Sequence, residues 1–179
     1  RDAPLDTFIR LGQALIEGLS RDGCQVNVSL ERAAGITHVA NTAGAEGSYE
    51  STTVAVTAEV SKVSHDDVLM VYDQCVGVGL PDDATLDALV RSITERLALA
   101  ARLVEAPAGA LPVIFTPAGS SCLLLPLEQA LSGKSVAEGV SPLAGRLGDA
   151  AFDASLTVED DATRADGPDS RPFDDEGVP

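Results

Sequence analysis

Apolar and polar residues alternate over two long stretches in the first half of the chain. Every second residue is apolar in residues 24–31, and residues 49–63 repeat the pattern. A period of two is typical of a β-strand with one buried face. A third apolar run, residues 68–77, follows directly after the turn-forming sequence His65-Asp66-Asp67. Strands that follow one another closely usually pair with their neighbours, so the sequence predicts an antiparallel β-meander.

Turn-forming residues divide these strands further. Ala33-Ala34-Gly35 predicts a turn, after which residues 36–40 would form a short strand of their own. Asn41–Gly47 is rich in residues that favour turns and predicts the next loop.

Helical spacing appears on both sides of the predicted sheet. Residues 5–19 place their apolar side chains on one stripe, and Gly23 is a suitable left-handed residue after that helix. A second apolar stripe runs from Leu86 to Val104, and Asp82 or Asp83 can cap the start of its helix. The expected fold class is therefore α+β, an antiparallel meander with packed helices.

The stretch from Leu111 to Gly133 predicts a strand followed by a helix. Residues 112–115 read as a short buried strand, Thr116 can cap the helix, and Pro117 suits the first helical position. Leucines leave no polar face on the early turns, so we expect a buried helix, with Gly133 as its stop.

We expect three segments along the chain. Residues 1–106 form the α+β unit, residues 107–161 the strand, the buried helix and the segment after it, and residues 162–179 an acidic loop. The chain starts at an arginine and stops directly after an acidic motif, which favours a piece of a longer protein.

Composition restricts the function and the location. A net charge of −16 argues against a nucleic-acid-binding surface, which needs lysine and arginine. Ten of the 28 acidic residues fall between Asp149 and Glu176, and solubility explains this charge better than mimicry of DNA. No apolar run approaches the roughly 20 residues of a membrane span, and no leader for export is visible. Cys24, Cys75 and Cys122 are far apart, so we expect reduced, buried thiols in a cytoplasmic protein.

No residue pattern for catalysis or metal binding is complete. His38 and His65 lie 27 positions apart, and neither has the helical partners of a zinc site. Ser120, Ser121 and Cys122 sit at a predicted strand-to-helix turn, but Leu123 breaks the nucleophile-elbow pattern, which favours helix capping.

Two further candidate sites are weaker still. Gly77-Val78-Gly79 lacks the third glycine of a phosphate loop, and aspartates follow it. The acidic runs Asp160-Asp161 and Asp174-Asp175-Glu176 lack the spacing of a calcium loop. We therefore expect no catalytic, cofactor-binding or metal-binding residue in this chain.

Several ordered motifs resemble the TldD/PmbA family, known as modulators of DNA gyrase and as zinc peptidases. They are the Ala40–Thr52 segment with its Asn-Thr-Ala-Gly sequence, Leu111–Gly133, Gly139–Gly148, Ser155–Thr163, and the closing Phe173-Asp174-Asp175-Glu176-Gly177. The resemblance implies that the closing motif leads into a larger C-terminal β-rich domain, which we expect this chain to lack. By residue chemistry alone, the role of the three carboxylates stays open.

Peptidase members of this family carry His-Glu-x-x-x-His on the helix that corresponds to the one after Pro117. Alignment through Leu131-Ser132-Gly133 puts Leu124, Leu125 and Gln129 at the three motif positions. A shift by one residue puts Leu125, Pro126 and Ala130 there, which again supplies no ligand. The resemblance thus implies the PmbA (TldE) branch, which lacks the zinc motif.

In the family, such a chain pairs with a zinc-bearing TldD subunit to cleave unfolded peptides. The resemblance therefore implies a non-catalytic partner subunit, in a heterodimer or a homodimer, that helps to hold an extended peptide; zinc would lie in the partner. The alternative is a non-enzymatic regulatory protein that acts on a toxin or on DNA gyrase. A third possibility, a serine or cysteine hydrolase around Ser120–Cys122, is the least favoured.

Overall fold

A three-stranded antiparallel sheet dominates the first part of the chain. The structure is a computed structural model that describes residues 3–164 and 167–178. Strand β1 (Cys24–Ala40) pairs with β2 (Glu46–Ser64), and β2 pairs with β3 (Asp67–Gly77). The predicted antiparallel meander is confirmed.

Alternation along β2 fixes which face of the sheet is buried. Val56, Ala58 and Val60 are fully buried, with 0% exposure, while the residues between them stay partly accessible. Val60 lies opposite Val26 of β1 and Val71 of β3, so the three strands contribute apolar side chains to the same face. A shift of one residue in this register would expose every one of them.

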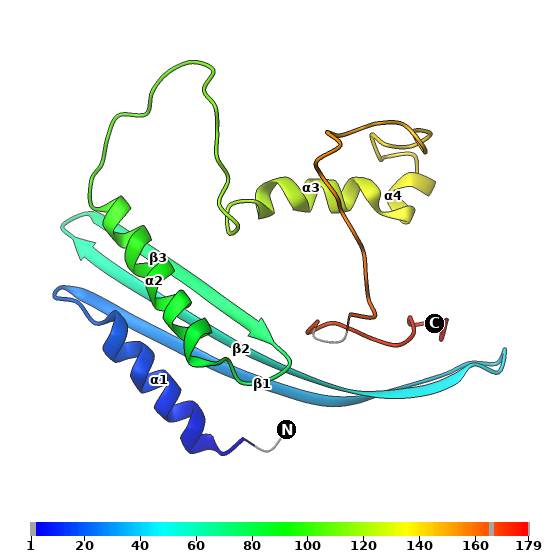
Figure 1. The fold of residues 1–179 in the computed structure, drawn as a ribbon, viewed down its shortest axis with the longest axis horizontal. Coiled ribbons are helices and arrows are strands. Elements are labelled where there is room, and N and C mark those ends of the chain that lie inside the picture. The colour runs from blue at the N-terminus through cyan, green and yellow to red at the C-terminus, as the bar shows by residue number, and fades with distance from the viewer. Residues whose placement is uncertain (1–2, 165–166, 179) are drawn as a thin grey trace. The chain divides into compact units, whose positions relative to one another are not determined.

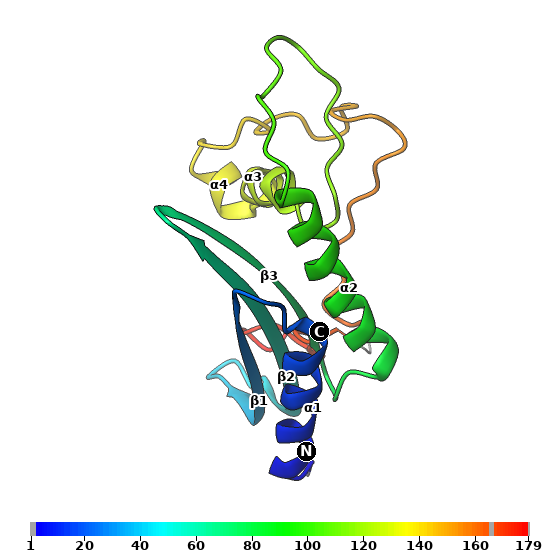
Figure 2. The same ribbon diagram turned by 90° about the vertical axis from the view of Figure 1, so that its left-hand side faces the viewer.

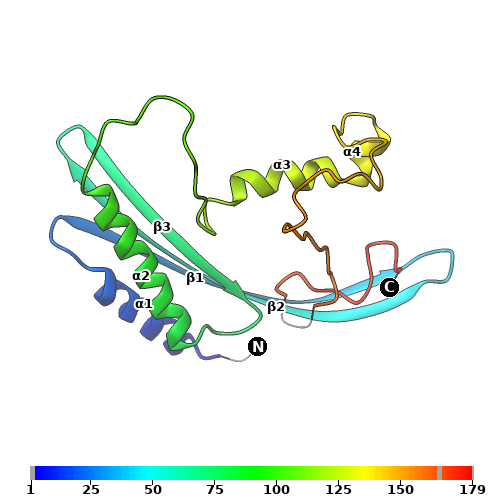
Figure 3. The same ribbon diagram turned by 45° about the horizontal axis from the view of Figure 1, so that its top comes forward.

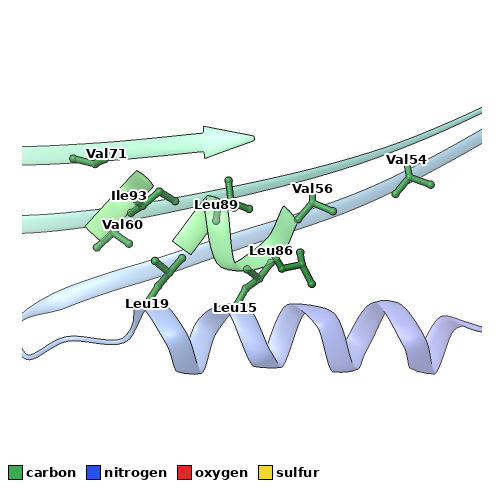
Figure 4. Close-up of a cluster of buried hydrophobic side chains, with 10 residues drawn as sticks. Leu15, Leu19, Val54, Val56, Val60, Val71, Leu86, Leu89 and Ile93 are labelled. Carbon is green, nitrogen blue, oxygen red and sulfur yellow. The ribbon is translucent and has the colours of Figure 1, made fainter. Parts of the chain in front are cut away.

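Two helices cover that face. Both α1 (Leu5–Leu19) and α2 (Asp83–Ala100) lie on the same side of the sheet (Figures 1 and 2). The Asp82 side chain accepts a hydrogen bond from the Thr85 backbone N–H at 2.8 Å, which confirms the predicted cap. The helices bury five leucine and isoleucine side chains against the strands (Figure 4): Leu15, Leu19, Leu86, Leu89 and Ile93.

The expected turn at Ala33-Ala34-Gly35 is wrong. β1 continues through these residues, and each pairs with a residue of β2, as Gly35 does with Ser51. β2 supplies hydrogen-bonding partners opposite Ala33-Ala34-Gly35, so these residues stay in the strand although their small side chains would also tolerate a turn. β3 ends at Gly77, opposite Val54, so residues 33–40 and 46–53 continue beyond it as a two-stranded ribbon.

The chain divides into two compact units. One contains residues 1–104 together with residues 160–179, and the other contains residues 105–159. Every residue of the buried hydrophobic core lies in the first unit, between Leu15 and Ile93. In the part of the chain that the structure describes, no helix combines the length and the apolar character that crossing a membrane requires.

The second unit differs from the prediction at its start. Residues 112–115 form no strand, and Ile114 is 94% exposed. An apolar run becomes a strand only where another strand accepts its backbone hydrogen bonds, and Pro112 and Pro117 also lack donors. Thr116 caps a turn, since its hydroxyl accepts from the Gly119 N–H at 3.1 Å, but the helix begins later and Pro117 is outside it.

Two short helices follow in this unit, α3 (Ser121–Leu131) and α4 (Gly133–Ala137). The expected burial of the leucine-rich helix is wrong, because no residue of α3 is buried and Leu124 is 48% exposed. Gly133 does not end the helical segment either, since it is the first residue of α4. A helix without a polar face predicts burial only if the chain provides something to cover it.

Candidate functional site

The strongest site-like feature of the first unit is its C-terminal segment, residues 167–178, which we call the strap. Asp174 shapes its last turn, because the Asp174 carboxylate accepts hydrogen bonds from the Val178 and Glu176 N–H groups, both at 2.9 Å. Gly177 has a φ of +82°, a conformation that suits glycine. Chiefly the Val178 bond holds the pKa of Asp174 below its ordinary value; desolvation opposes this shift, and the Glu176 bond adds to it.

The strap lies beside the ribbon (Figure 3). One side-chain amide and one aromatic ring connect the two segments. The Asn41 side-chain amide donates to the Glu176 carbonyl oxygen at 3.0 Å, while its own oxygen accepts from the Ala43 and Ala45 N–H groups. The half-buried Phe173 ring meets Tyr49 edge-on, with centroids 5.4 Å apart and an interplanar angle of 77°.

Glycine permits this close approach. A Cβ atom at Gly47 would lie 2.7 Å from the Phe173 ring, closer than carbon atoms approach without a clash. Two of the segments that carry the family resemblance, Ala40–Thr52 at the tip of the ribbon and Phe173–Gly177 near the end of the chain, are thus in direct contact. This contact answers the open question about the closing motif for Asp174: its carboxylate builds the turn that docks on the ribbon.

A groove of about 420 Å³ lies between the strap and β2. One wall consists of Tyr49, Ser51 and Thr53, which alternate along β2 on the face opposite the core residues Val54 and Val56. The other wall consists of Pro168, Asp169, Ser170 and Arg171. Arg171 also forms an ion pair with Asp175 of the strap at 3.2 Å.

The two histidines are not brought together. His38 lies on the ribbon opposite Ser48, whereas His65 lies in the turn after β2, with a φ of +58°. Ser48 and Ser64 lie sixteen positions apart on β2, which corresponds to about 50 Å along the strand. These two side chains therefore cannot share a metal ion.

Ser120, Ser121 and Cys122 lie at the start of α3 and bond to carbonyl oxygens three residues before them. Such local bonds are typical of helix starts, so helix capping explains the positions of these side chains. The expectation of three buried thiols is wrong for Cys122, which is exposed, while Cys24 and Cys75 are half-buried beside the core. Desolvation, and then the charge of Asp73, raises the pKa of the Cys75 thiol, so it is a poor nucleophile.

The glycine pair and the first acidic run also have local roles. Asp161 accepts hydrogen bonds from the Thr163 hydroxyl and N–H, which lower its pKa. After Gly77 and Gly79, Asp82 caps the N-terminus of α2 and already accepts a hydrogen bond from the Thr85 N–H, a donor that a phosphate bound there would need. Neither feature assembles a ligand site.

The residues of α3 do not fit a zinc ion. Leu124 and Leu125 carry no donor atom, and Gln129 offers only a neutral amide, whereas zinc binds imidazole, thiolate and carboxylate groups. Within residues 3–164 and 167–178, no group of three or more histidine, cysteine, aspartate and glutamate side chains is arranged to hold a metal ion.

Sequence reasoning missed the residues that dock the strap. Asn41 was recognisable as a turn former, and Tyr49 as a strand residue, but nothing in the sequence connects either to a segment more than 120 positions away. The one usable signal was that both segments, Ala40–Thr52 and Phe173–Gly177, resemble motifs of the same family.

Comparisons with known proteins bear on the whole chain. Residues 108–179 match the family model described as the PmbA/TldA metallopeptidase C-terminal domain. A comparison with curated protein sequences found no significant match. Among solved structures, TldE from Thermococcus kodakarensis is similar, with a TM-score of 0.76 and 22% identity over 99% of this chain.

The chain spans 41% of the length of that TldE. At this level of identity the similarity establishes the fold, which is that of part of a TldE protein. The family match assigns residues 108–179 to the C-terminal domain that the family model describes, and the antiparallel sheet with packed helices is that of a partial TldE-like fold. In the described part of this range the domain contributes α3, α4 and turns, but no strand. The matched domain over residues 108–179 and the fold shared over nearly the full length together support a fragment of a TldD/PmbA-family protein.

Proposed function

We propose that this chain is the non-catalytic, PmbA/TldE-like subunit of a TldD-type zinc metallopeptidase that degrades unfolded peptides in the cytoplasm. The zinc ion would lie in a TldD-like partner subunit. The family's metallopeptidase character and the TldE-like fold support this assignment. The same chain would contribute to holding the peptide rather than to cutting it.

The single observation that carries the proposal is the composition of α3. Where zinc-bearing relatives have two histidines and a glutamate, this helix has Gln129 and two leucines, Leu124 and Leu125. A zinc peptidase needs ligands to fix the metal and a base to activate its water. This helix provides neither, which supports a TldD-like partner chain as the source of the chemistry.

The experiment compares proteolysis of an unfolded substrate, such as reduced and alkylated casein, by the full-length parent protein alone and with its zinc-bearing paralogue. We expect cleavage only by the pair, together with zinc in the paralogue and cleavage lost on chelation. Cleavage by the parent protein alone, or stoichiometric zinc in it, would overturn the proposal. If neither preparation cleaves, the proposal also fails, and regulation of a toxin or of DNA gyrase becomes the better hypothesis.

Matched substitutions in the two subunits test which of them supplies the catalytic residues. Leu124→Ala and Gln129→Ala in this chain should leave the cleavage rate of the pair within about twofold, because both side chains are exposed and hold no metal. Replacement of either motif histidine in the paralogue should abolish cleavage. A complete loss of activity with Gln129→Ala in a folded complex would contradict the assignment.

A further inference from the structure

We propose that the groove between the strap and β2 binds the backbone of an extended peptide through the hydroxyl groups of Tyr49, Ser51 and Thr53. This inference rests on the proposed function, because it names the place on this chain where the substrate of the same complex would be held. It concerns the first unit alone, since both walls of the groove belong to it.

The three hydroxyls have unused hydrogen-bonding capacity. Among the described residues, none of the side chains of Tyr49, Ser51 and Thr53 forms a hydrogen bond, although the hydroxyl of the adjacent Thr52 donates to the Val78 carbonyl oxygen at 2.9 Å. A hydroxyl both donates and accepts, so each can bind a carbonyl oxygen or an N–H group. The wall therefore presents three free groups of the kind that a peptide backbone requires.

The spacing of these groups matches an extended chain. Residues at alternate positions of β2 are about 6.6–6.8 Å apart, which is also the two-residue repeat of an extended peptide. Tyr49 to Thr53 therefore spans about 13 Å, the length of roughly four peptide residues. A row with this repeat can bind successive backbone groups without regard to side-chain identity, as an unfolded substrate demands.

The opposite wall restricts the charge of the ligand. The Arg171 guanidinium is paired with Asp175 at 3.2 Å, while Asp169 adds a further carboxylate to the groove. The chain as a whole carries a net charge of −16. Neutral or basic peptides are therefore favoured over acidic ones, because an acidic ligand would meet unbalanced negative charge.

The test uses the full-length parent protein and a fluorescein-labelled seven-residue peptide of alternating alanine and valine with a lysine at each end. Its dissociation constant is measured by fluorescence anisotropy for the parent protein and for the variant Y49F/S51A/T53V. Each lost hydroxyl is expected to weaken binding about twofold to tenfold, so the triple variant should bind at least about tenfold more weakly. Tyr49→Phe keeps the ring against Phe173, and Thr53→Val keeps a β-branched side chain.

Thr57→Val is the matched control, because Thr57 lies on the same face of β2 but does not line the groove. We expect its dissociation constant to equal that of the parent protein. N-methylation of alternate backbone amides of the peptide should weaken binding to the parent protein and to Thr57→Val, but make little difference for the triple variant. That pattern identifies backbone recognition through these hydroxyls.

Equal dissociation constants for the parent protein and a folded triple variant would overturn the inference. Should the triple variant unfold, Tyr49→Phe alone decides, since it removes one oxygen atom and an unchanged dissociation constant would argue against the site. Cleavage by the two-subunit complex is measured in parallel. Cleavage that persists while the triple variant binds normally would reject the groove and leave the proposed function standing, whereas absent cleavage would reject the proposed function itself.

Discussion

The Asn41 side chain donates a hydrogen bond to the Glu176 carbonyl oxygen at 3.0 Å, across 135 positions of sequence. The same amide closes the β1–β2 loop through the Ala43 and Ala45 N–H groups. One residue thus shapes the tip of the ribbon and fastens the strap to it. This double role makes the docking of the strap sensitive to small changes at either partner.

Asn41→Ala should therefore loosen both the loop and the strap. We expect faster amide hydrogen exchange at Ala43, Ala45 and the strap, and a loss of stability of about 1–2 kcal/mol in the ribbon, because three bonds to one side chain disappear. Thr42→Ala, in the same loop, has no hydrogen bond to the strap and should leave exchange there unchanged. Equal exchange rates for the two variants would contradict the role assigned to Asn41.

Phe173→Ala should release the strap while leaving the core intact. The ring contributes an edge-on contact with Tyr49, of the kind worth about 0.5–1.5 kcal/mol beyond the area that it buries. Limited proteolysis should then cut within the strap at rates well above those of the parent protein. Phe152→Ala, at a half-exposed phenylalanine of the other unit, serves as the control and should not change cleavage of the strap.

Gly47→Ala tests the close approach of the ring. The new Cβ atom would lie 2.7 Å from Phe173, so we expect a cost of about 1–3 kcal/mol in docking of the strap. Gly35→Ala is the matched control on the same ribbon, where the nearest atom would be the Ser51 hydroxyl at 3.9 Å. In a double-mutant cycle, Phe173→Ala should remove most of the effect of Gly47→Ala on proteolysis; additive effects would rule out the proposed clash.

Ile93→Ala should destabilise the whole first unit. This side chain is 0% exposed between α2 and the sheet, and truncating a buried isoleucine costs about 2–5 kcal/mol (Figure 4). Leu99→Ala on the same helix removes a side chain that is 77% exposed and should cost well under 1 kcal/mol. Urea denaturation followed by circular dichroism gives both values, and similar losses for the two variants would contradict the core described above.

Docking of the strap should weaken in acid. Hydrogen bonds from Val178 and Glu176 lower the pKa of Asp174, so its carboxylate stabilises the docked turn above the pKa of the undocked state. That contribution is lost as the pH falls through the lower pKa of the docked state. Nuclear magnetic resonance spectra of the Val178 and Glu176 amides should follow this transition, and Asp174→Asn should remove it; an identical pH profile in that variant would assign the transition to another group.

The sequence predicted the sheet and the first two helices because local patterns were sufficient there. Alternation at Val54–Val60 and the stripe of Leu86–Ile93 each required only a neighbouring element to pack against, and the chain supplies one. Asp82 was identifiable as a cap because capping is a contact within one helical turn. The largest successes therefore lie where each residue's role depends on residues close by in sequence.

The errors lie where the structure of a residue depends on whether a segment distant in sequence pairs with it or covers it. Ala33-Ala34-Gly35 stays in β1 because the opposite strand continues, and residues 112–115 form no strand because none pairs with them. The leucines of α3 are exposed for the same kind of reason. Of the candidate site, the docking turn at Asp174 and the row of hydroxyls on β2 became recognisable only once the strap was seen beside the ribbon.

The two-stranded ribbon also has a consequence for the order in which the protein matures on the ribosome. Synthesis at 5–20 residues per second separates Asn41 from Glu176 by about 7–27 s, a long interval compared with the roughly 1–10 µs in which a hairpin forms. During that interval the nascent ribbon has neither the strap nor a third strand at its tip, and an isolated pair of strands is only marginally stable. Its exposed backbone is then accessible to chaperones or can pair with another nascent chain. Once Phe173 and Gly177 are synthesised, they pack against the tip of the ribbon and cover it.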